Sequence, residues 1–114
     1  MIDWEALLVR QAEADLRGVY EHIAFTLLEP GNAEKMARRI YIRIRKLSSM
    51  PQSYAVYPKE PWKSRGLRHA NVGKYIVFFV PVESKRTVVV IRIVYGGRDI
   101  DRVLEETPDI NEVI

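Results

Sequence analysis

The stretch "RIVYGGRDI", residues 92–100, places an arginine on each side of two glycines at the end of an apolar run. Adjacent glycines can bring backbone N–H groups close to a phosphate, but this pair lacks the spacing of a P-loop or a dinucleotide-binding fingerprint. We therefore interpret Gly96 and Gly97 as the turn through which the final strand leaves its sheet, with Asp99 capping a short helix. Arg98 is then presented at the exit of the strand, where a guanidinium can meet an anion.

Arg92 differs from Arg98 because it lies inside the apolar run "TVVVIRIVY". Strict alternation of side chains predicts that it shares a face with three valines, Val88, Val90 and Val94. A charge among valines is costly unless it is paired or lies at a functional opening. Two alternatives stay open for Arg92: an ion pair with an acid of the first helix, such as Asp15 or Glu21, or contact with a target.

Positive charge is concentrated in the middle of the chain. Residues 1–34 carry two basic and seven acidic side chains, whereas residues 35–74 carry eleven basic side chains and a single acid, Glu60. The last forty residues carry five basic and seven acidic ones, so the net charge of +3 conceals a middle segment at +10 (eleven minus one). Such a segment indicates either a surface for phosphate or an acidic protein, or a well-solvated helix face.

The proline-rich loop "YPKEPW" mixes aromatic and basic side chains, with Tyr57 and Trp62 among Lys59 and Lys63. Such rings either stack on bases or anchor a protein partner, or they cover the core beneath the loop. On the first alternative, the candidates for contact with a target are Trp62, Lys63, Arg65 and Arg92.

Composition bounds the class of protein. The chain of 114 residues is 47% hydrophobic, which suits one globular domain over residues 1–114 without a metal or disulfide. It contains no cysteine, which excludes thiol nucleophiles and cysteine-based zinc sites and suits the cytoplasm. The N-terminus does not read as a signal peptide, and no run approaches the roughly 18 to 20 apolar residues of a membrane span. We expect no metal, no cofactor and no membrane contact.

The first half of the chain predicts one strand and two helices. Residues 4–10 are short and apolar, which predicts a strand, and apolar side chains at helical spacing predict a helix over residues 11–28. The stripe of that helix comprises Ala12, Leu16, Val19, Tyr20, Ile23 and Leu27. "EPGN" ends the helix and supplies Asn32 as the N-cap of a second helix over residues 33–48. So short a connection predicts an antiparallel helical hairpin.

The second half predicts three antiparallel strands. After a loop over residues 48–62, strand patterns cover residues 64–70, 74–82 and 87–95, with Pro81 implying a bulge or a strand end. One or two helical turns follow, and residues 106–114 form a flexible tail or a docking segment. The order β-α-α-β-β-β predicts an α+β domain, an antiparallel sheet packed against a helical hairpin with a short C-terminal helix.

Four short pieces of sequence occur in a recognisable order within residues 4–105. They are "LR" at Leu67, "YIVFF" at Tyr75, "RI" at Arg92 and "YGGRD" at Tyr95. In this order they resemble the RelE/ParE family of toxins of type II toxin–antitoxin systems, to which plasmid stabilization proteins belong. The resemblance implies a cognate antitoxin as partner, which wraps the toxin with a segment that folds on binding, and contact with promoter DNA only through the antitoxin complex.

The resemblance implies growth arrest by one of two routes. ParE-like toxins inhibit DNA gyrase, whereas RelE-like toxins cut mRNA in the ribosome without a metal. For the ribonuclease, the resemblance assigns Arg68, Lys74 and Arg98 as phosphate clamps and leaves Tyr95 for proton transfer. RelE-like ribonucleases commonly place a further tyrosine after the last arginine, where this chain has Leu104.

The missing tyrosine and the modest net charge of +3 favour a ParE-like toxin, acting on gyrase or an unassigned target. A RelE-like ribosome-dependent mRNA endoribonuclease is the alternative, and a degenerate member that only binds its antitoxin is a third. Whether the chain is an enzyme therefore depends on geometry. Convergence of Arg68, Lys74 and Arg98 on one concave face would support the ribonuclease.

Overall fold

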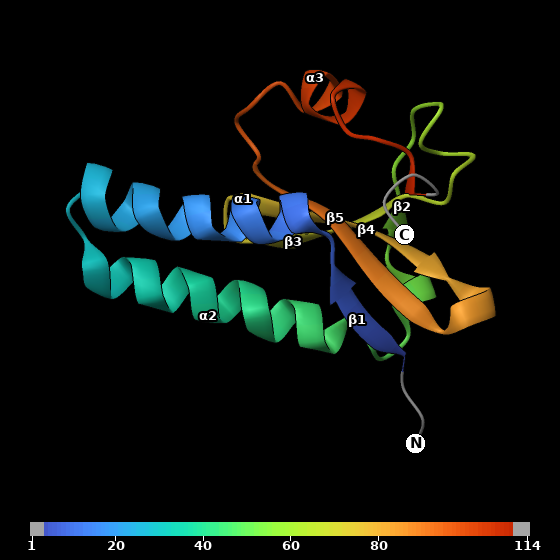
Figure 1. The fold of residues 1–114 in the computed structure, drawn as a ribbon, viewed down its shortest axis with the longest axis horizontal. Helices are drawn as coiled ribbons and strands as arrows, with labels where there is room; N and C mark the ends of the chain where they lie inside the picture. Colours follow the sequence, from blue (N-terminus) through green and yellow to red (C-terminus); the bar gives the residue numbers. More distant parts are fainter. Residues whose placement is uncertain (1–3, 111–114) are drawn as a thin grey trace.

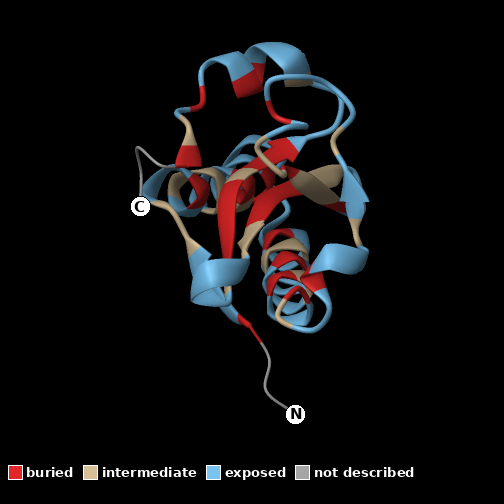
Figure 2. Ribbon diagram, turned by 90° about the vertical axis from the view of Figure 1, so that its right-hand side faces the viewer, coloured by how far each residue is buried: buried red, intermediate tan, exposed pale blue. Residues whose placement is uncertain are grey.

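The computed structural model describes residues 4–110, which form an α+β fold as predicted. Within these residues a five-stranded sheet lies between a helical hairpin on one face and a loop with a short helix on the other (Figures 1 and 2). The strands are β1 (Glu5–Leu8), β2 (Ala55–Val56), β3 (Arg68–Val72), β4 (Tyr75–Val82) and β5 (Thr87–Tyr95). The helices are α1 (Arg10–Glu21), α2 (Pro30–Lys46) and α3 (Ile100–Glu105), with a π-helical turn at His22–Thr26.

The strand order is β1-β5-β4-β3-β2. Strands β3, β4 and β5 pair antiparallel, as predicted, whereas β1 pairs parallel to β5, with Leu7 opposite Val89. Two parallel neighbouring strands require a long crossover connection. The segment from α1 to β4 provides this connection between β1 and β5. The short β2 lies within the segment that was predicted as a loop. The next strand was predicted from residue 64, but β3 begins at Arg68, because turns occupy the residues before it.

The two helices form the predicted antiparallel hairpin, with differences at its connection. The α-helical part of the first helix ends at Glu21, and the π-helical turn that follows leaves Leu27 51% exposed, so its predicted burial was wrong. The second helix begins at Pro30, because the missing N–H of proline costs nothing in the first turn. Glu29 is therefore the N-cap position, and the predicted Asn32 cap was wrong: its amide donates to the Glu29 carboxylate at 2.8 Å.

The central strands are buried along most of their length (Figure 2). Their side chains alternate between two hydrophobic clusters, one on each face of the sheet. The hairpin-side cluster includes Ala12, Val19, Ile40, Ile44, Val77, Phe79, Val88 and Val90. The opposite cluster includes Trp62, Leu67, Phe78, Val80, Val89, Ile91, Leu104 and Ile110. Both faces of β4 and β5 are buried, which explains their nearly continuous apolar sequences.

A β-bulge interrupts this alternation. Phe78 lies opposite Arg92 while Phe79 lies opposite Val90, so Ile91 has no partner across the pair. Arg92 therefore shares a face with Phe78 and with Val94, as predicted for Val94, but the prediction from strict alternation was wrong for Val88 and Val90, which lie on the other face. Pro81 is not at the bulge; it lies next to the end of β4.

The C-terminal segment packs on the face of the sheet opposite the hairpin. The Asp99 side chain accepts the Arg102 N–H at 3.3 Å and caps α3, as predicted. Thr107 and Ile110 are buried, so residues 107–110 dock; the rest of the predicted tail, residues 111–114, lies outside the described residues. Among residues 4–110, no helix is long and apolar enough to cross a membrane.

Candidate functional site

A groove of about 960 Å³ lies between the hairpin and the ends of β4 and β5; we call it the hairpin groove. Its floor is mostly apolar, and its polar members include three cations. The lining residues are Ala14, Asp15, Gly18, Val19, His22, Ile23, Leu27, Met36, Arg39, Gly73, Lys74, Tyr75, Ile93, Tyr95 and Arg98. An apolar floor with cations at its edge fits an amphipathic segment that carries acidic side chains.

Two of the three predicted phosphate clamps, Lys74 and Arg98, line this groove together with Tyr95. The Lys74 carbonyl accepts the Gly96 N–H at 2.7 Å, which joins the β3–β4 turn to the exit of β5. The rings of Tyr75 and Tyr95 meet edge to face, with their centroids 5.7 Å apart. Burial, followed by the neighbouring Tyr95, raises the pKa of Tyr75, so its hydroxyl keeps its proton at physiological pH.

The two glycines form the turn predicted for them, and close contacts require their small size. A Cβ on Gly96 would lie 3.1 Å from the Lys74 carbonyl oxygen, and one on Gly97 would lie 2.5 Å from Cε2 of Tyr95. The second distance is shorter than any normal contact, so the Tyr95 ring rests where only glycine leaves room. Neither glycine has a positive φ; the constraint at Gly96 and Gly97 is space.

Arg68, the third predicted clamp, is not in the hairpin groove. It begins β3, whereas Lys74 follows the end of that strand, roughly 15 Å away at about 3.3 Å per residue. Its guanidinium Nη1 donates to the Tyr54 carbonyl at 2.6 Å and lies on the hairpin face, because Arg68 pairs with Phe79. The structure therefore brings two of the three cations together and leaves Arg68 apart.

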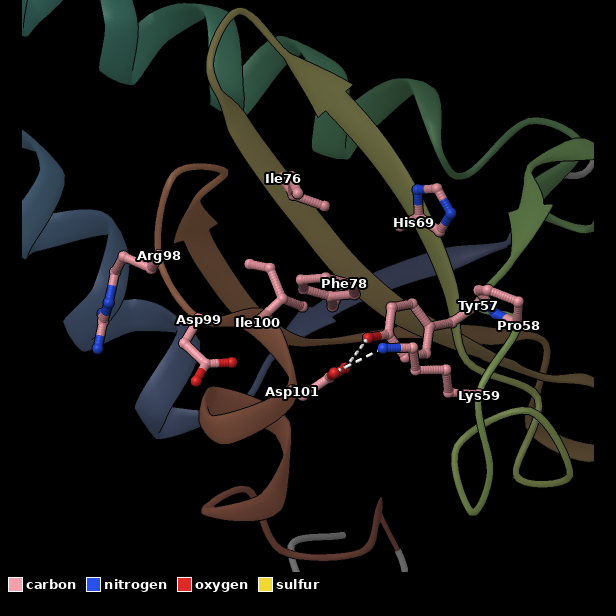
Figure 3. Close-up of a pocket in the computed structure, with 10 residues that line it drawn as sticks. All are labelled: Tyr57, Pro58, Lys59, His69, Ile76, Phe78, Arg98, Asp99, Ile100 and Asp101. Carbon is pink, nitrogen blue, oxygen red and sulfur yellow. Dashed lines mark hydrogen bonds and ion pairs between the residues drawn. The ribbon is translucent and has the colours of Figure 1, made fainter.

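A second concave surface, the loop pocket, lies on the opposite face of the sheet and has a volume of about 410 Å³ (Figure 3). The Asp101 carboxylate accepts the Tyr57 hydroxyl at 2.7 Å and Lys59 Nζ at 2.6 Å. His69 lies above this cluster, whereas the Arg98 side chain lies at the far end of the pocket and points away from it (Figure 3). The lining residues are Tyr57, Pro58, Lys59, His69, Ile76, Phe78, Arg98, Asp99, Ile100 and Asp101.

The loop pocket holds its titratable groups in fixed protonation states. Burial, and then the hydrogen bond to Asp101, raises the pKa of Tyr57 to about 12. Hydrogen bonds from Lys59 and Tyr57 lower the pKa of Asp101, and burial lowers the pKa of His69. Near neutral pH the tyrosine is thus protonated, the carboxylate ionised and the imidazole uncharged.

The residues predicted to contact a target are mostly engaged inside the molecule. Trp62 is 4% exposed and donates its indole N–H to the Leu104 carbonyl at 3.3 Å, so it covers the core. Arg65 stacks on Trp62 at 4.8 Å and pairs with Asp109 at 2.9 Å. Lys63 is exposed.

Arg92 makes the ion pair with Asp15 that the sequence left open, with Nε and Oδ2 2.8 Å apart. A second guanidinium nitrogen donates to Asp15 Oδ1 at 3.1 Å, and a third donates to the Thr107 hydroxyl at 3.2 Å. Asp15 Oδ2 also accepts the Ile93 N–H at 2.9 Å, on the edge of β5 that β1 does not reach. One carboxylate thus joins the hairpin and the sheet, and Arg92 extends the connection to the C-terminal segment.

No group of three or more His, Asp or Glu side chains within residues 4–110 could hold a metal ion.

The sequence matches a family model described as the ParE toxin of type II toxin–antitoxin systems, parDE, over residues 7–100. The chain belongs to the ParE toxin family. A comparison with curated proteins finds no match.

Solved structures share the fold of this ParE-family toxin. The chromosomal ParDE system from P. aeruginosa is 24% identical with a TM-score of 0.67, covering 83% of this chain and 98% of that chain. The RelBE2 toxin–antitoxin complex from Mycobacterium tuberculosis is 18% identical with a TM-score of 0.60, covering 83% and 93%. A mutant of E. coli RelE in the free state is 9% identical with a TM-score of 0.64, covering 98% and 99%.

Two features of this ParE-family toxin escaped the sequence analysis. The bridge from Tyr57 to Asp101 spans 44 residues of sequence, so no local pattern indicates it. The floor of the hairpin groove combines residues of α1, α2, β4 and β5, and the one signal for it was the basic segment over residues 35–74.

Proposed function

We propose that this chain is a ParE-like toxin that arrests growth by binding and inhibiting DNA gyrase in the cytoplasm, and that it does not cut RNA. The position of Arg68 is the observation that supports this proposal best. Its guanidinium is bonded to the Tyr54 carbonyl, at the other end of β3 from Lys74. Arg68, Lys74 and Arg98 could hold one phosphate only if all three converged. Lys74 and Arg98 share the hairpin groove, but the length of β3 separates Arg68 from Lys74.

Metal-independent RNA cleavage also needs a base for the 2′-hydroxyl and an acid for the leaving oxygen. On the hairpin groove the Tyr75 pKa is raised and the Asp15 carboxylate is occupied by Arg92 and Ile93. A groove whose carboxylate is already bonded, and whose mostly apolar lining includes three cations, is better suited to binding a protein than to catalysis.

RelE-like cleavage of mRNA is the second candidate function, because Lys74, Tyr95 and Arg98 do share the hairpin groove. Under that alternative Lys74 and Arg98 would hold the phosphate and Tyr95 would transfer a proton.

The proposed partner of the hairpin groove is the cognate antitoxin. Arg39, Lys74 and Arg98 lie around an apolar floor, which favours an amphipathic antitoxin segment with acidic side chains on its edges. Two of the similar solved structures are a toxin–antitoxin system and a toxin–antitoxin complex, which agrees with such a partner. Promoter DNA would be contacted through the antitoxin complex.

Purified toxin, released from its antitoxin, tests the proposal in two parallel assays. We expect inhibition of gyrase supercoiling or accumulation of gyrase-dependent DNA breaks, and no new mRNA ends in a translating ribosome extract. Arg98→Ala and Arg68→Ala, compared with growth and RNA integrity as readouts, separate the two candidate functions: neither should change RNA integrity, whereas under the ribonuclease alternative Arg98→Ala should abolish RNA cleavage. Specific mRNA cleavage without gyrase inhibition would refute the proposal and establish the alternative.

A further inference from the structure

Two large apolar side chains stand exposed at the connection between α1 and α2. Phe25 is 70% exposed and Leu28 is 79% exposed. Neither lines the hairpin groove, although their neighbours Ile23 and Leu27 do. We call Phe25 and Leu28 the tip patch, and this end of the hairpin projects past the end of the sheet (Figure 1).

The backbone of the tip holds these side chains outward. The Leu27 N–H donates to the His22 carbonyl and the Glu29 N–H donates to the Ile23 carbonyl, both at 3.0 Å. Between them Leu28 adopts a left-handed φ of 57°, which crowds the Cβ of any residue except glycine and is tolerated best by asparagine. If this connection served only to reverse the chain, glycine or asparagine at position 28 would adopt the same φ with less backbone strain. Leucine adds both strain and an exposed apolar surface.

A stripe of cations begins beside the tip patch. Lys35, Arg38 and Arg45 are exposed on α2 at spacings of three and seven residues, which place them on one side of the helix. Within residues 4–110 none of the three forms an ion pair. We call them the basic stripe, and their charge is available to an acidic partner.

Charges at the tip itself distinguish a protein from a nucleic acid as that partner. The segment between Glu21 and Glu29 contains no lysine or arginine, and both of those acids are exposed. A phosphate backbone brought against Phe25 and Leu28 would meet these two carboxylates, and no lysine or arginine of residues 22–28 would offset their charge. An apolar pocket on a protein, with an acidic surface beyond it along α2, complements both the tip patch and the basic stripe.

We propose that the tip patch and the basic stripe form the surface that contacts the target protein of this toxin, separately from the groove that takes the antitoxin. The inference rests on the proposed function, in which the target is gyrase. It assigns the partner a chemistry: a hydrophobic pocket for two side chains, next to acidic residues that face α2.

A double variant, Phe25→Gln with Leu28→Asn, tests the tip patch, because asparagine keeps the left-handed turn while both side chains become polar. Met50→Asn is a matched control: Met50 is 74% exposed, also has a left-handed φ of 56°, and follows the opposite end of α2. We expect the double variant to arrest growth less and to inhibit gyrase about 30-fold more weakly, as for loss of an interface anchor. Its melting temperature should be no lower than that of wild type, because asparagine relieves the left-handed strain at Leu28, and its antitoxin affinity should equal that of wild type. The control should match wild type in growth arrest, gyrase inhibition and antitoxin affinity.

A charge-reversed variant, Arg38→Glu with Arg45→Glu, tests the basic stripe. Inhibition of gyrase should weaken and should depend less on salt than inhibition by wild type does. Binding of the wild-type chain to DNA alone, lost in this variant, would overturn the choice of a protein partner.

Several outcomes would overturn the tip patch as a target surface. Growth arrest equal to wild type in the double variant would do so. A loss of antitoxin affinity in that variant would assign the patch to the antitoxin. An altered sedimentation coefficient would assign the patch to contact with a second copy of the chain. A wild-type chain that arrests growth without inhibiting gyrase would contradict only the proposed target, since growth still reports on the patch. A wild-type chain with no effect on growth would overturn both.

Discussion

Replacing Asp15 of α1 with alanine should strongly destabilise the free toxin. The Asp15 side chain is 8% exposed and its partner Arg92 is 12% exposed, so neither charge can recover solvation by turning outward. The substitution would leave the guanidinium with only the Thr107 hydroxyl, at 3.2 Å, and would leave the Ile93 N–H without an acceptor.

The magnitude follows from these two losses. Removing one partner of a buried ion pair costs about 3–5 kcal/mol. An unsatisfied buried N–H costs about 1–3 kcal/mol, although the two effects overlap because both arise at one carboxylate. We therefore expect Asp15→Ala to lower the free energy of unfolding by about 4 kcal/mol, a large part of the 5–15 kcal/mol typical of a domain. Asp15→Asn keeps an oxygen for Ile93 and should cost about 2 kcal/mol less.

Urea unfolding of the antitoxin-free toxin measures these values, and a double-mutant cycle isolates the ion pair. Arg92→Met keeps most of the volume of the side chain and removes its charge. Combined with Asp15→Asn, it should recover about 2 kcal/mol relative to the sum of the single changes, because no unpaired charge then remains. The double variant should also arrest growth, since Arg92 acts within the fold.

Two results would contradict this reasoning. A loss below about 1 kcal/mol for Asp15→Ala would mean that the pair behaves like an exposed one. Loss of gyrase inhibition in a double variant that unfolds like wild type would restore Arg92 as a target contact, the alternative that the sequence left open.

Three further predictions test particular positions. Gly18→Ala should stabilise the free toxin by about 1 kcal/mol in urea, because a Cβ meets nothing within 4 Å in the interior of α1, and should weaken antitoxin binding in calorimetry, because Gly18 lines the hairpin groove. Gly97→Ala should cost about 1–2 kcal/mol, and Tyr95→Ala should suppress that cost, because the new Cβ overlaps the Tyr95 ring. The pKa of Tyr57 is about 12 in the folded state against 10 in the unfolded state, so the folded state keeps its proton to higher pH. The stability that this shift contributes is full below pH 10 and is lost as the pH rises from 10 to about 12. Between pH 9 and pH 11 wild type should lose up to about 1.4 kcal/mol more stability than Tyr57→Phe.

Local signals explain what could be predicted from the sequence. Helical spacing predicted the hairpin, and turn residues predicted the three antiparallel strands. The Asp99 cap could be predicted because the N–H group that it accepts belongs to a residue only three positions further along the chain. The bulge at Ile91 and the parallel pairing of β1 were missed, because both depend on which strands become neighbours. For the same reason strict alternation misplaced Arg92 relative to Val88 and Val90. Its ion pair with Asp15 was one of the two alternatives that the sequence left open, because a charge inside an apolar strand has to be paired or to lie at an opening.

The separation of Arg68 from Lys74 and Arg98 also limits how the chain could acquire ribonuclease activity. A change of rotamer cannot bring Arg68 into the hairpin groove, because β3 lies between its Cα and Lys74 and its register with β4 is fixed by the buried Ala70 and Val72. A shift of register by one residue would turn both of these side chains away from the hairpin-side cluster. A third cation in the groove would therefore have to come from another segment, and Arg39 of α2 is such a cation, at a position that the proposed antitoxin segment would contact. Binding and catalysis would then compete for the same surface, which favours a toxin that acts by binding.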